Sequence, residues 1–397
     1  MPEEKQKRPL IWIMAGESSG DLYGARIAAE LKRQNPACEV KGMGGVKMRA
    51  AGVDILVDST ELGVIGIVEI LGSIFKFIRI MLFCVREAKR QRPDAVLMVD
   101  YPGFNIRLAR RLWKIGIPVI WYISPQVWAW RKSNIPKYAK FCRKMLVIFP
   151  FEPEVWRGSG LDVEFTGHPL LEVVRERTDP AIRRDPDRLL LLPGSRKSET
   201  SRLLFPFLET AALLKQRHPG MKFAVSAPRE KTYRDILRYL ADFKRKRPDV
   251  VLPELDITCG ETARWMQEAV AGLAASGTVT VESAVADLPL VVAYRLHPVT
   301  FQLARWIIRK LFRGYFTMPN IILDKCVFQE YLQFQVVPRD LADAVDRILP
   351  GGERRDEVMA DMRAMREALS CGPENATARA ASAILEVISG KKTAVRS

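Results

Sequence analysis

The sequence predicts an α/β protein built from two doubly wound domains, each a parallel sheet with helices on both faces. Short apolar runs alternate with segments of helical length, which is the pattern of a parallel sheet covered by helices. This alternation stops near residue 166 and restarts near residue 189. The length of 397 residues exceeds one ordinary core and suits two domains of roughly 150–200 residues each.

Each half supplies four apolar runs that we interpret as buried strands, with helical segments between them. In the first half we expect strands at 10–15, 40–42, 95–99 and 119–122, and helices at 20–34 and 106–115. In the second half we expect strands at 189–192, 222–226, 270–275 and 290–294, and helices at 200–217, 231–244 and directly after 275.

The seam is expected between Thr166 and Asp187, where glycine and proline residues interrupt a charged stretch. The predicted domains are therefore residues 1–170 and 171–375, followed by a helix and tail at 376–397. That helix can pack on the first domain or on a partner chain, which leaves a homodimer open. Two such domains facing one another would bind a ligand in the cleft between them.

Charge and cysteine usage restrict the partners and the compartment. The chain carries 62 Lys and Arg against 46 Asp and Glu, a net charge of +16, which favours nucleic acid or an anionic membrane as partner. Six scattered Cys without a CxxC pair and three separated His argue against a zinc site or a disulfide framework and fit a reducing cytoplasm. The N-terminus lacks a signal-peptide pattern. The longest apolar stretch, 63–85, contains three charged residues, which argues against a transmembrane helix.

The turn at 275–282 is typical of a nucleotide-sugar site. An apolar strand ends there, and Ser276, Gly277 and Thr278 offer hydroxyls and backbone N–H groups at a helix start, where a diphosphate binds well. Glu282 follows Thr278 by four residues, so it faces the same side and could accept hydrogen bonds from ribose hydroxyls. Simple helix capping is the alternative.

Two further loops have the composition of ligand-binding turns. After strand 189–192, Gly194 and Ser195 can present backbone N–H groups and Arg196 a guanidinium group to phosphate oxygens, although the loop does not match a P-loop. After strand 10–15, two glycines frame a polar turn containing Glu17, Ser18, Ser19 and Asp21. For both loops an ordinary capped βα turn is the alternative.

The ends of two other strands carry candidate catalytic and binding groups. Asp100 follows strand 95–99 and is either a general base or a cap for a helix beginning near Asn105. Ser124 and Trp128 follow strand 119–122 in an aromatic cluster that can stack on a sugar or acyl chain or pack between domains. At the domain crossing His168 is either a hinge or capping residue or a substrate contact. Polar side chains suited to a base or sugar also occur later, at Asn320, Gln329 and Glu330.

Two basic amphipathic segments suggest contact with a membrane surface. Residues 65–86 place apolar side chains at helical spacing between basic ones, and residues 301–316 repeat this with aromatic residues. Such helices insert at the lipid headgroup boundary, whereas the alternative is a core-facing helix with a solvated basic face. Two such segments in a strongly basic chain favour the membrane. The side chains expected to face it are Ile70, Ile74, Phe75, Ile78, Trp306 and Phe312.

Taken together, these motifs resemble the lipid-A-disaccharide synthase family from about residue 10 to 385. The resemblance rests on ESSGD at 17–21, GVIG at 63–66 with Glu69, SPQVWAW at 124–130, PFE at 150–152, GHP at 167–169, LPGSR at 192–196, ASGT at 275–278 with Glu282, and PN at 319–320. It implies a GT-B fold and an inverting glycosyltransferase that needs no metal or cofactor. The implied reaction joins UDP-2,3-diacylglucosamine to 2,3-diacylglucosamine 1-phosphate through a β-1,6 linkage and releases UDP. The implied location is the inner face of the cytoplasmic membrane of a Gram-negative bacterium.

The resemblance also implies roles for individual residues. Asp100 would be the base of an acceptor and membrane-facing N-terminal domain, and the C-terminal domain would bind the UDP-sugar. One departure concerns the motif after strand 95–99, where the family commonly has a second Asp and this chain has Gly103. The donor-binding residues would be Gly194, Ser195, Arg196, Ser276, Gly277, Thr278, Glu282, Asn320, Gln329 and Glu330, and the acceptor residues Glu17, Ser18, Ser19, Asp21, Asn105, Ser124, Trp128 and His168.

Three rival functions are open to the sequence. Another GT-B enzyme using a UDP-sugar, such as a peptidoglycan glycosyltransferase or an epimerase, would share the loops. The two amphipathic segments argue against the epimerase, because its substrates are water-soluble. A noncatalytic lipid-binding homologue is compatible with Gly103. A nucleic-acid-binding function would account for the positive net charge but for none of the other features. The chain contains no recognised nucleic-acid motif, so we expect no nucleic-acid partner.

Overall fold

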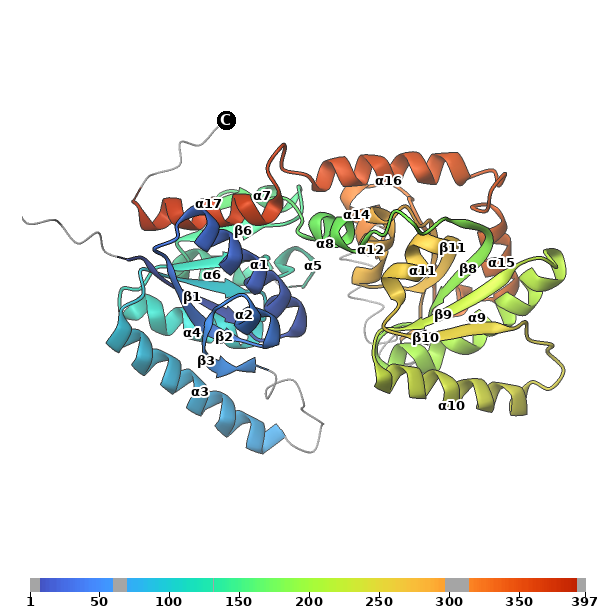
Figure 1. The fold of residues 1–397 in the computed structure, drawn as a ribbon, viewed down its shortest axis with the longest axis horizontal. Helices are drawn as coiled ribbons and strands as arrows, with labels where there is room; N and C mark the ends of the chain where they lie inside the picture. Colours follow the sequence, from blue (N-terminus) through green and yellow to red (C-terminus); the bar gives the residue numbers. More distant parts are fainter. Residues whose placement is uncertain (1–7, 60–69, 131, 297–313, 391–397) are drawn as a thin grey trace, which may run out of the picture. The chain divides into compact units, whose positions relative to one another are not determined.

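The computed structural model describes residues 8–59, 70–130, 132–296 and 314–390 and divides the chain into two compact units (Figure 1). Unit 1 comprises Met1–Pro169 and Leu369–Ser397, and unit 2 comprises Leu170–Ala368. The chain therefore leaves unit 1, forms all of unit 2 without interruption, and returns to finish unit 1.

Unit 1 is a seven-stranded parallel sheet in the order β3-β2-β1-β4-β5-β6-β7. Because the strand order reverses between β1 and β4, the carboxyl ends of these two strands form the topological switch point at which doubly wound folds bind ligands. The strands are β1 Leu10–Ala15, β2 Glu39–Gly44, β3 Asp54–Asp58, β4 Ala95–Val99, β5 Val119–Tyr122, β6 Lys144–Val147 and β7 Asp162–Phe165. The helices are α1 Ser18–Gln34, α2 Val46–Ala50, α3 Ile70–Gln91, α4 Pro102–Lys114, α5 Val127–Trp130, α6 Ile135–Phe141, α7 Glu152–Val155 and α17 Ala376–Ile388, with a 3-10 turn η3 at Lys132–Asn134.

Both faces of this sheet are apolar. Its central strands β1 and β4 are runs of consecutive apolar residues, and successive residues of a strand point to opposite sides of the sheet. Trp12 and Met14 of β1 join a buried cluster with α3 and α4, which includes Met81 and Phe104. On the other face α1 lies so close to β1 that a Cβ on Gly24 would come within 3.1 Å of Ile13. The result is a rigid sheet that fixes the loops at its carboxyl edge.

Unit 2 is a six-stranded parallel sheet in the order β10-β9-β8-β11-β12-β13. Its strand order reverses between β8 and β11, so its switch point lies at the loops that follow these two strands. The strands are β8 Asp185–Leu192, β9 Lys222–Ala227, β10 Leu255–Cys259, β11 Ala269–Ala275, β12 Leu290–Tyr294 and β13 Gln329–Leu332. The helices are α8 Leu170–Arg177, α9 Lys197–Arg217, α10 Glu230–Lys246, α11 Thr262–Glu268, α12 Thr278–Val285, α14 Met318–Leu323, α15 Pro338–Asp346 and α16 Arg355–Leu369, with a 3-10 turn η4 at Gln333–Gln335.

The C-terminal helix α17 packs along α1 in unit 1 (Figure 1). The amide of Gln34 donates to the carbonyl of Ala378 at 3.0 Å and accepts from Ser382 Oγ at 3.1 Å. Arg379 forms an ion pair with Glu164 on β7. Helix α17 is thus an integral part of unit 1.

The two parallel sheets confirm the predicted fold class. The largest shift of a predicted helix start is that of α4, which begins at Pro102 rather than near residue 106, because proline suits the first helical turn, where an N–H has no partner in any case. Within the described ranges, no helix combines the length and apolar character needed to cross a membrane.

Candidate active site

Asp100 lies at the switch point of unit 1, directly after β4, in a strained turn. Both Asp100 and Tyr101 adopt left-handed backbone conformations, with φ of 44° and 50°, which cost about 1–3 kcal/mol each for residues other than glycine. The helix α4 begins after them with Tyr101 as its N-cap, so Asp100 is not the cap of this helix. The structure thus removes the capping alternative and leaves the half-buried Asp100 side chain at the sheet edge.

Asn105 holds this turn in place. Its side chain is fully buried, and its Nδ2 donates to the carbonyl oxygens of Asp100 at 2.8 Å, Met14 at 3.3 Å and Val99 at 3.4 Å. One amide therefore ties the ends of β1 and β4 together. Asn105 thus supports the Asp100 turn, and as a fully buried side chain it does not reach the protein surface.

Glu17, in the turn after β1, influences Asp100 directly. Burial raises the pKa of the Asp100 carboxyl, and the negative charge of Glu17 raises it further, while the backbone N–H of Tyr101 opposes both effects. The two turns also touch, since a Cβ on Gly16 would lie 2.2 Å from Cδ1 of the Tyr101 ring. A proton acceptor of raised pKa beside a second carboxylate is a typical catalytic arrangement.

The other polar residues of the first turn divide into exposed and structural ones. Ser18 and Ser19 are exposed in the first turn of α1. Asp21 is buried, and its carboxylate accepts from the backbone N–H groups of Gly45 at 2.6 Å, Lys47 at 3.0 Å and Met48 at 3.1 Å. Asp21 therefore fixes the start of α2, and its oxygens are already engaged.

A buried carboxyl group, Glu152, links the turns after β5 and β6. Its Oε2 accepts from the backbone N–H groups of Ile148 at 3.2 Å and Phe149 at 3.0 Å, and Ser124 also bonds to it. Trp156 Nε1 donates to Ser124 Oγ at 3.2 Å. Burial raises the pKa of Glu152 to about 7. Ser124, a predicted acceptor residue, is thus buried in a polar cluster that sequence analysis missed.

Trp128 and His168 lie beside this cluster. Trp128 is half-buried and meets Phe151 edge-to-face at 5.2 Å between ring centroids. His168 is buried against Phe149, with its ring centroid 5.3 Å away, and burial lowers its pKa to about 3. His168 is therefore neutral and packed within unit 1, as a residue that supports the fold.

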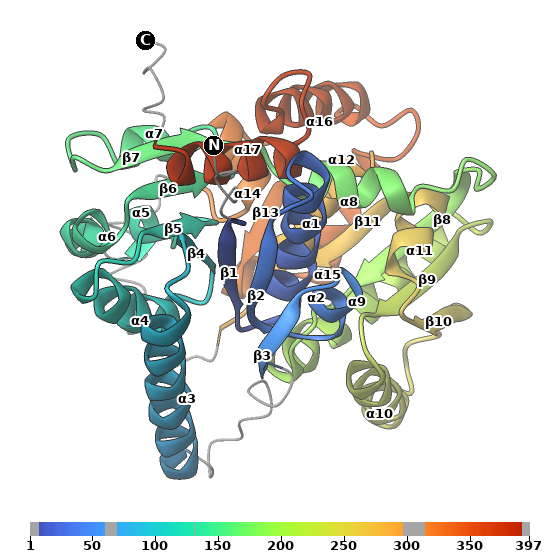
Figure 2. The ribbon, with the colours of Figure 1, turned by 60° about the vertical axis from the view of Figure 1, so that its left-hand side comes forward.

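The helix α3 carries an exposed apolar stripe and lies against the Asp100 turn. Phe75, Ile78 and Leu82 are 74%, 50% and 59% exposed, and Lys76, Arg79 and Arg86 are exposed between them. On its inner side Phe77 stacks on Tyr101 at 6.5 Å. Figure 2 shows this helix extending along the outside of unit 1 beyond its sheet. The side chains of Ile70 and Ile74, and all of Trp306 and Phe312, lie outside the described residues.

In unit 2, the turn after β11 leaves a helix N-terminus open. The N–H of Ser276 donates to the Ala293 carbonyl at 3.2 Å, and Gly277 and Thr278 are exposed. No side chain of the described chain caps α12, so the structure disfavours the capping alternative for this turn. A Cβ on Gly277 would meet no atom of the described residues within 4 Å, so none of these residues covers the turn at Gly277.

The neighbouring turn after β8 is already occupied by a carboxylate. Glu199 Oε2 accepts from the N–H groups of Ser195 at 3.1 Å and Arg196 at 3.3 Å, and Oε1 pairs with the Arg196 guanidinium at 3.3 Å. Gly194, with φ of 112°, permits this approach, since a Cβ there would lie 2.5 Å from that of Glu199. The sequence analysis missed Glu199 as the partner of these N–H groups. The exposed Arg196 guanidinium remains available to an anion.

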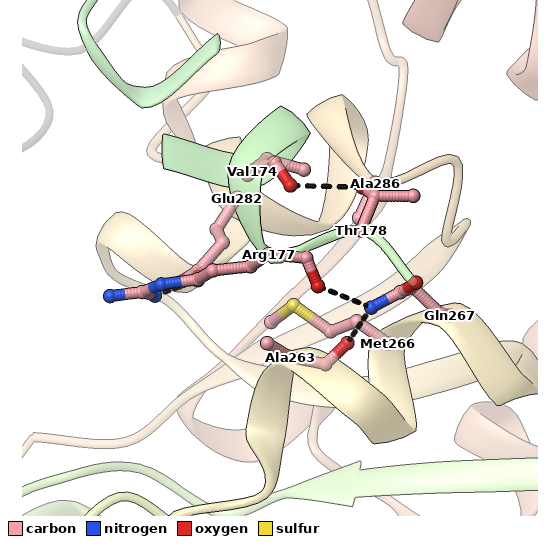
Figure 3. Close-up of a pocket in the computed structure, with 8 residues that line it drawn as sticks. All are labelled: Val174, Arg177, Thr178, Ala263, Met266, Gln267, Glu282 and Ala286. Atoms are coloured by element: carbon pink, nitrogen blue, oxygen red, sulfur yellow. Dashed lines mark hydrogen bonds and ion pairs between the residues drawn. The ribbon is translucent and has the colours of Figure 1, made fainter. Parts of the chain in front are cut away.

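Glu282 is four residues into α12 and pairs with Arg177 at the end of α8. The distance from Arg177 Nη1 to Glu282 Oε1 is 3.4 Å. Burial raises the pKa of Glu282, and Arg177 opposes this. Both residues border a shallow pocket between α8, α11 and α12 (Figure 3). Arg177 also escaped the sequence analysis, because it lies in the charged stretch assigned to the seam.

Asn320 and Glu330 form a closed network within unit 2. Asn320 is buried; its Oδ1 accepts from the Phe328 N–H at 2.8 Å, and its Nδ2 donates to Phe328 O at 2.8 Å and Glu330 Oε1 at 2.9 Å. Glu330 also accepts from the N–H groups of Phe316 and Thr317. These residues hold the start of α14, and the half-buried Gln329 lies next to them on β13.

The loops thus group by unit and by switch point. Asp100 and Glu17 lie at the β1–β4 switch of unit 1, and Arg196 and the turn 276–278 lie at the β8–β11 switch of unit 2. A carboxyl group of raised pKa can accept a proton, and a helix N-terminus without a side-chain cap can bind an anion.

Solved structures of other proteins share this two-sheet fold. The structure is similar to a UDP-GlcNAc 2-epimerase from Neisseria meningitidis bound to UDP-GlcNAc (TM-score 0.61, 11% identity, 96% of this chain and 100% of that one). It is also similar to MurG of Acinetobacter baumannii (TM-score 0.53, 17% identity, 95% and 99%). At these identities the likeness shows the fold, which is that of GT-B glycosyltransferases.

The sequence relatives are closer. The chain is 35% identical to the lipid-A-disaccharide synthase of Koribacter versatilis, over 96% of this chain and 99% of the relative. It is 33% identical to that of Coxiella burnetii, over 91% and 94%. A model of the family described as lipid-A-disaccharide synthetase matches residues 11–384. The chain therefore belongs to the lipid-A-disaccharide synthase family of glycosyltransferases.

Proposed function

We propose that the protein joins UDP-2,3-diacylglucosamine to 2,3-diacylglucosamine 1-phosphate, forming the β-1,6-linked disaccharide of lipid A and releasing UDP. Family membership supports the reaction. The single observation that supports Asp100 as its catalyst is the strained turn that holds this carboxyl at the β1–β4 switch, next to Glu17.

In this proposal Asp100 removes the proton from the 6-hydroxyl of the acceptor. The resulting oxygen attacks the anomeric carbon of the donor from the face opposite UDP, so the configuration inverts. Raised basicity makes Asp100 a better proton acceptor than an ordinary carboxylate, as long as it is ionised at the working pH. Ser18 and Ser19, exposed in the adjacent turn, supply hydroxyl groups for binding the acceptor.

The leaving diphosphate gains negative charge as the bond breaks, and unit 2 offers two groups for it. The N-terminus of α12 directs backbone N–H groups and the helix dipole at the turn 276–278. The exposed Arg196 guanidinium supplies a positive charge. Because Glu199 already binds the N–H groups of Ser195 and Arg196, the α12 terminus is the stronger candidate for the phosphates, and Glu282 for the ribose.

We further propose that α3 rests on the inner surface of the cytoplasmic membrane. Its exposed stripe of Phe75, Ile78 and Leu82 lies among exposed basic residues, the composition of a helix that lies at a lipid headgroup boundary. The same helix contacts the Asp100 turn through Phe77. An acylated acceptor held in the membrane would therefore present its sugar close to the proposed base.

The departure at Gly103 does not remove the proposed base. A Cβ at this position would meet no described atom within 4 Å, so the family's second Asp would fit here. If that Asp were required for catalysis, this protein would bind its lipid substrates without joining them.

The direct test supplies both acylated glucosamine substrates to the purified protein and measures disaccharide and UDP. We expect equal amounts of both products. Asp100→Asn should lower the rate by about 10²–10⁴-fold, the usual contribution of a general base, with UDP binding unchanged. Asp54→Asn, which alters an exposed carboxylate on edge strand β3, is the control and should retain full activity. UDP binding without any disaccharide from the wild-type protein would support the noncatalytic alternative.

A further inference from the structure

The end of α8 is fixed to α11 by one side chain, that of Gln267. Its Oε1 accepts from the N–H of Asp179 at 2.7 Å, and its Nε2 donates to the carbonyls of Arg177 at 3.1 Å and Ala263 at 3.0 Å. Figure 3 shows this amide between the two helices. The position of the Arg177 backbone is therefore fixed by two hydrogen bonds to Gln267, one from its own carbonyl group and one from the N–H of Asp179, two residues later.

From this fixed backbone, the Arg177 side chain reaches Glu282 on α12. Its Nη1 lies 3.4 Å from Glu282 Oε1, and Figure 3 shows the Glu282 side chain reaching down to the extended Arg177 side chain. The Glu282 side chain is 21% exposed and that of Arg177 47%. The pair thus lies at the border of the pocket, where the carboxylate remains accessible.

Glu282 follows the open N-terminus of α12 by one helical turn, on the same face as Thr278. A nucleotide whose phosphates lie at this terminus would bring its ribose within reach of Glu282. A carboxylate can accept two hydrogen bonds from the vicinal hydroxyls of a ribose only when it is charged and held in one orientation. In the structure the charged group that holds it is Arg177.

We infer that Arg177 is a positioning residue for nucleotide recognition: it orients the Glu282 carboxylate to accept hydrogen bonds from the 2′- and 3′-hydroxyls of UDP. The inference rests on the proposed function, because it takes UDP as the nucleotide that the protein binds. It assigns a specificity role to a residue that does not itself contact the substrate.

The experiment measures dissociation constants for UDP and for 2′,3′-dideoxy-UDP by calorimetry on the full-length protein. Arg177→Gln should weaken UDP binding about two- to fivefold, the range expected for an exposed ion pair. Its affinity for dideoxy-UDP should equal that of the wild type, since the hydroxyls that Glu282 binds are absent. Arg177→Lys should restore most of the loss. Arg175→Gln removes the same charge from an exposed site on α8 and should leave both affinities unchanged.

A double variant completes the test. If Arg177 acts through Glu282, then Arg177→Gln should cause no further loss in a Glu282→Gln background. Equal weakening of UDP and dideoxy-UDP binding by Arg177→Gln, or unchanged UDP binding, would overturn the inference. Neither result affects the proposed function, which stands if the wild type makes disaccharide and fails if it makes none.

Discussion

At the scale of single residues, burial and then the negative charge of Glu17 raise the pKa of the Asp100 carboxyl. A general base works only when ionised, so kcat/KM should fall as the pH drops through the pKa of Asp100. Glu17→Gln removes the neighbouring charge and lowers that pKa. We therefore expect the acidic limb of the kcat/KM profile to move to lower pH in this variant, measured with the disaccharide assay.

The control for this shift is Glu39→Gln, which changes an exposed carboxylate of β2 and should leave the profile in place. An acidic limb that stays where it is in Glu17→Gln, or that moves to higher pH, would show that Asp100 is not the group whose ionisation the profile reports.

Glu152 gives a second pH prediction, for stability. Its pKa rises from 4.5 to about 7 on folding, chiefly through burial. The unfolded chain therefore loses this proton before the folded protein does, and the free energy of unfolding falls as the pH rises from 4.5 to about 7. Glu152→Gln, which keeps an oxygen for the two backbone N–H groups, should be more stable than the wild type at pH 8 by about 1–3 kcal/mol.

Denaturant unfolding at pH 5 and pH 8 measures this difference. Glu154→Gln, on the same short helix but 61% exposed at its side chain, should behave as the wild type does at both values. If Glu152→Gln gave no larger gain at pH 8 than at pH 5, folding would not raise the pKa of Glu152.

Which single residues could be predicted depends on how local their signals are. Asp100 directly follows an apolar strand, so the sequence alone placed it at a sheet edge. Glu282 lies one turn into the helix after another such strand, where the sequence also placed it. Arg177, Glu152 and Glu199 act through partners, and the sequence contains no pattern that pairs Arg177 with a residue 105 positions later. Asp21 was mispredicted for the same reason. The polar composition of its turn suggested that it binds the acceptor substrate, but its carboxylate accepts hydrogen bonds from backbone N–H groups at the start of α2.

At the scale of elements, central strands were predictable and peripheral ones were not. Strands β1, β4, β5 and β12 begin and end at the predicted residues, because a strand buried on both faces is a continuous apolar run. The edge strands β3, β7, β10 and β13 mix charged and polar residues with apolar ones. The inner strand β6 begins with a charged residue, Lys144, which interrupts the apolar pattern. Its side chain is buried and forms ion pairs with Asp162 and Glu164 on β7.

The exposed stripe of α3 leads to a prediction about membrane binding. The triple variant Phe75→Ser, Ile78→Ser and Leu82→Ser should bind anionic vesicles at least tenfold more weakly, since each lost apolar side chain contributes about 1 kcal/mol. Its melting temperature should not change, because these side chains are largely exposed. Vesicle co-sedimentation at several salt concentrations measures both the apolar and the electrostatic part.

Val251→Ser is the control, since Val251 is an apolar residue that is 83% exposed and belongs to unit 2, which does not include α3. A triple variant that unfolds would show that the stripe packs within the protein. A folded triple variant with unchanged vesicle binding would contradict the proposed role of α3.

At the scale of the whole molecule, the order of the chain determines the order in which the units can be completed. Unit 2 is continuous from Leu170 to Ala368, whereas unit 1 needs both its first 169 residues and the segment from Leu369 onward. Unit 2 has all of its residues before α17 is synthesised. Unit 1 can therefore form all of its contacts only after every residue of unit 2 has been synthesised, although the sheet of unit 1 comes first in the sequence.

This chain path predicts that truncation acts on one unit only. A chain ending at Gly372 lacks α17 and with it the buried Ala380, Ala381, Ala383 and Ile384. Burial of these side chains contributes about 4–5 kcal/mol, which approaches the whole stability of an ordinary domain. In calorimetry we expect unit 1 to melt at a much lower temperature, while the transition of unit 2 stays in place and still rises with added UDP. A chain ending at Gly390 keeps α17 and should melt as the full-length protein does. Loss of the UDP-sensitive transition in the shorter truncation would show instead that unit 2 depends on the end of the chain for its stability.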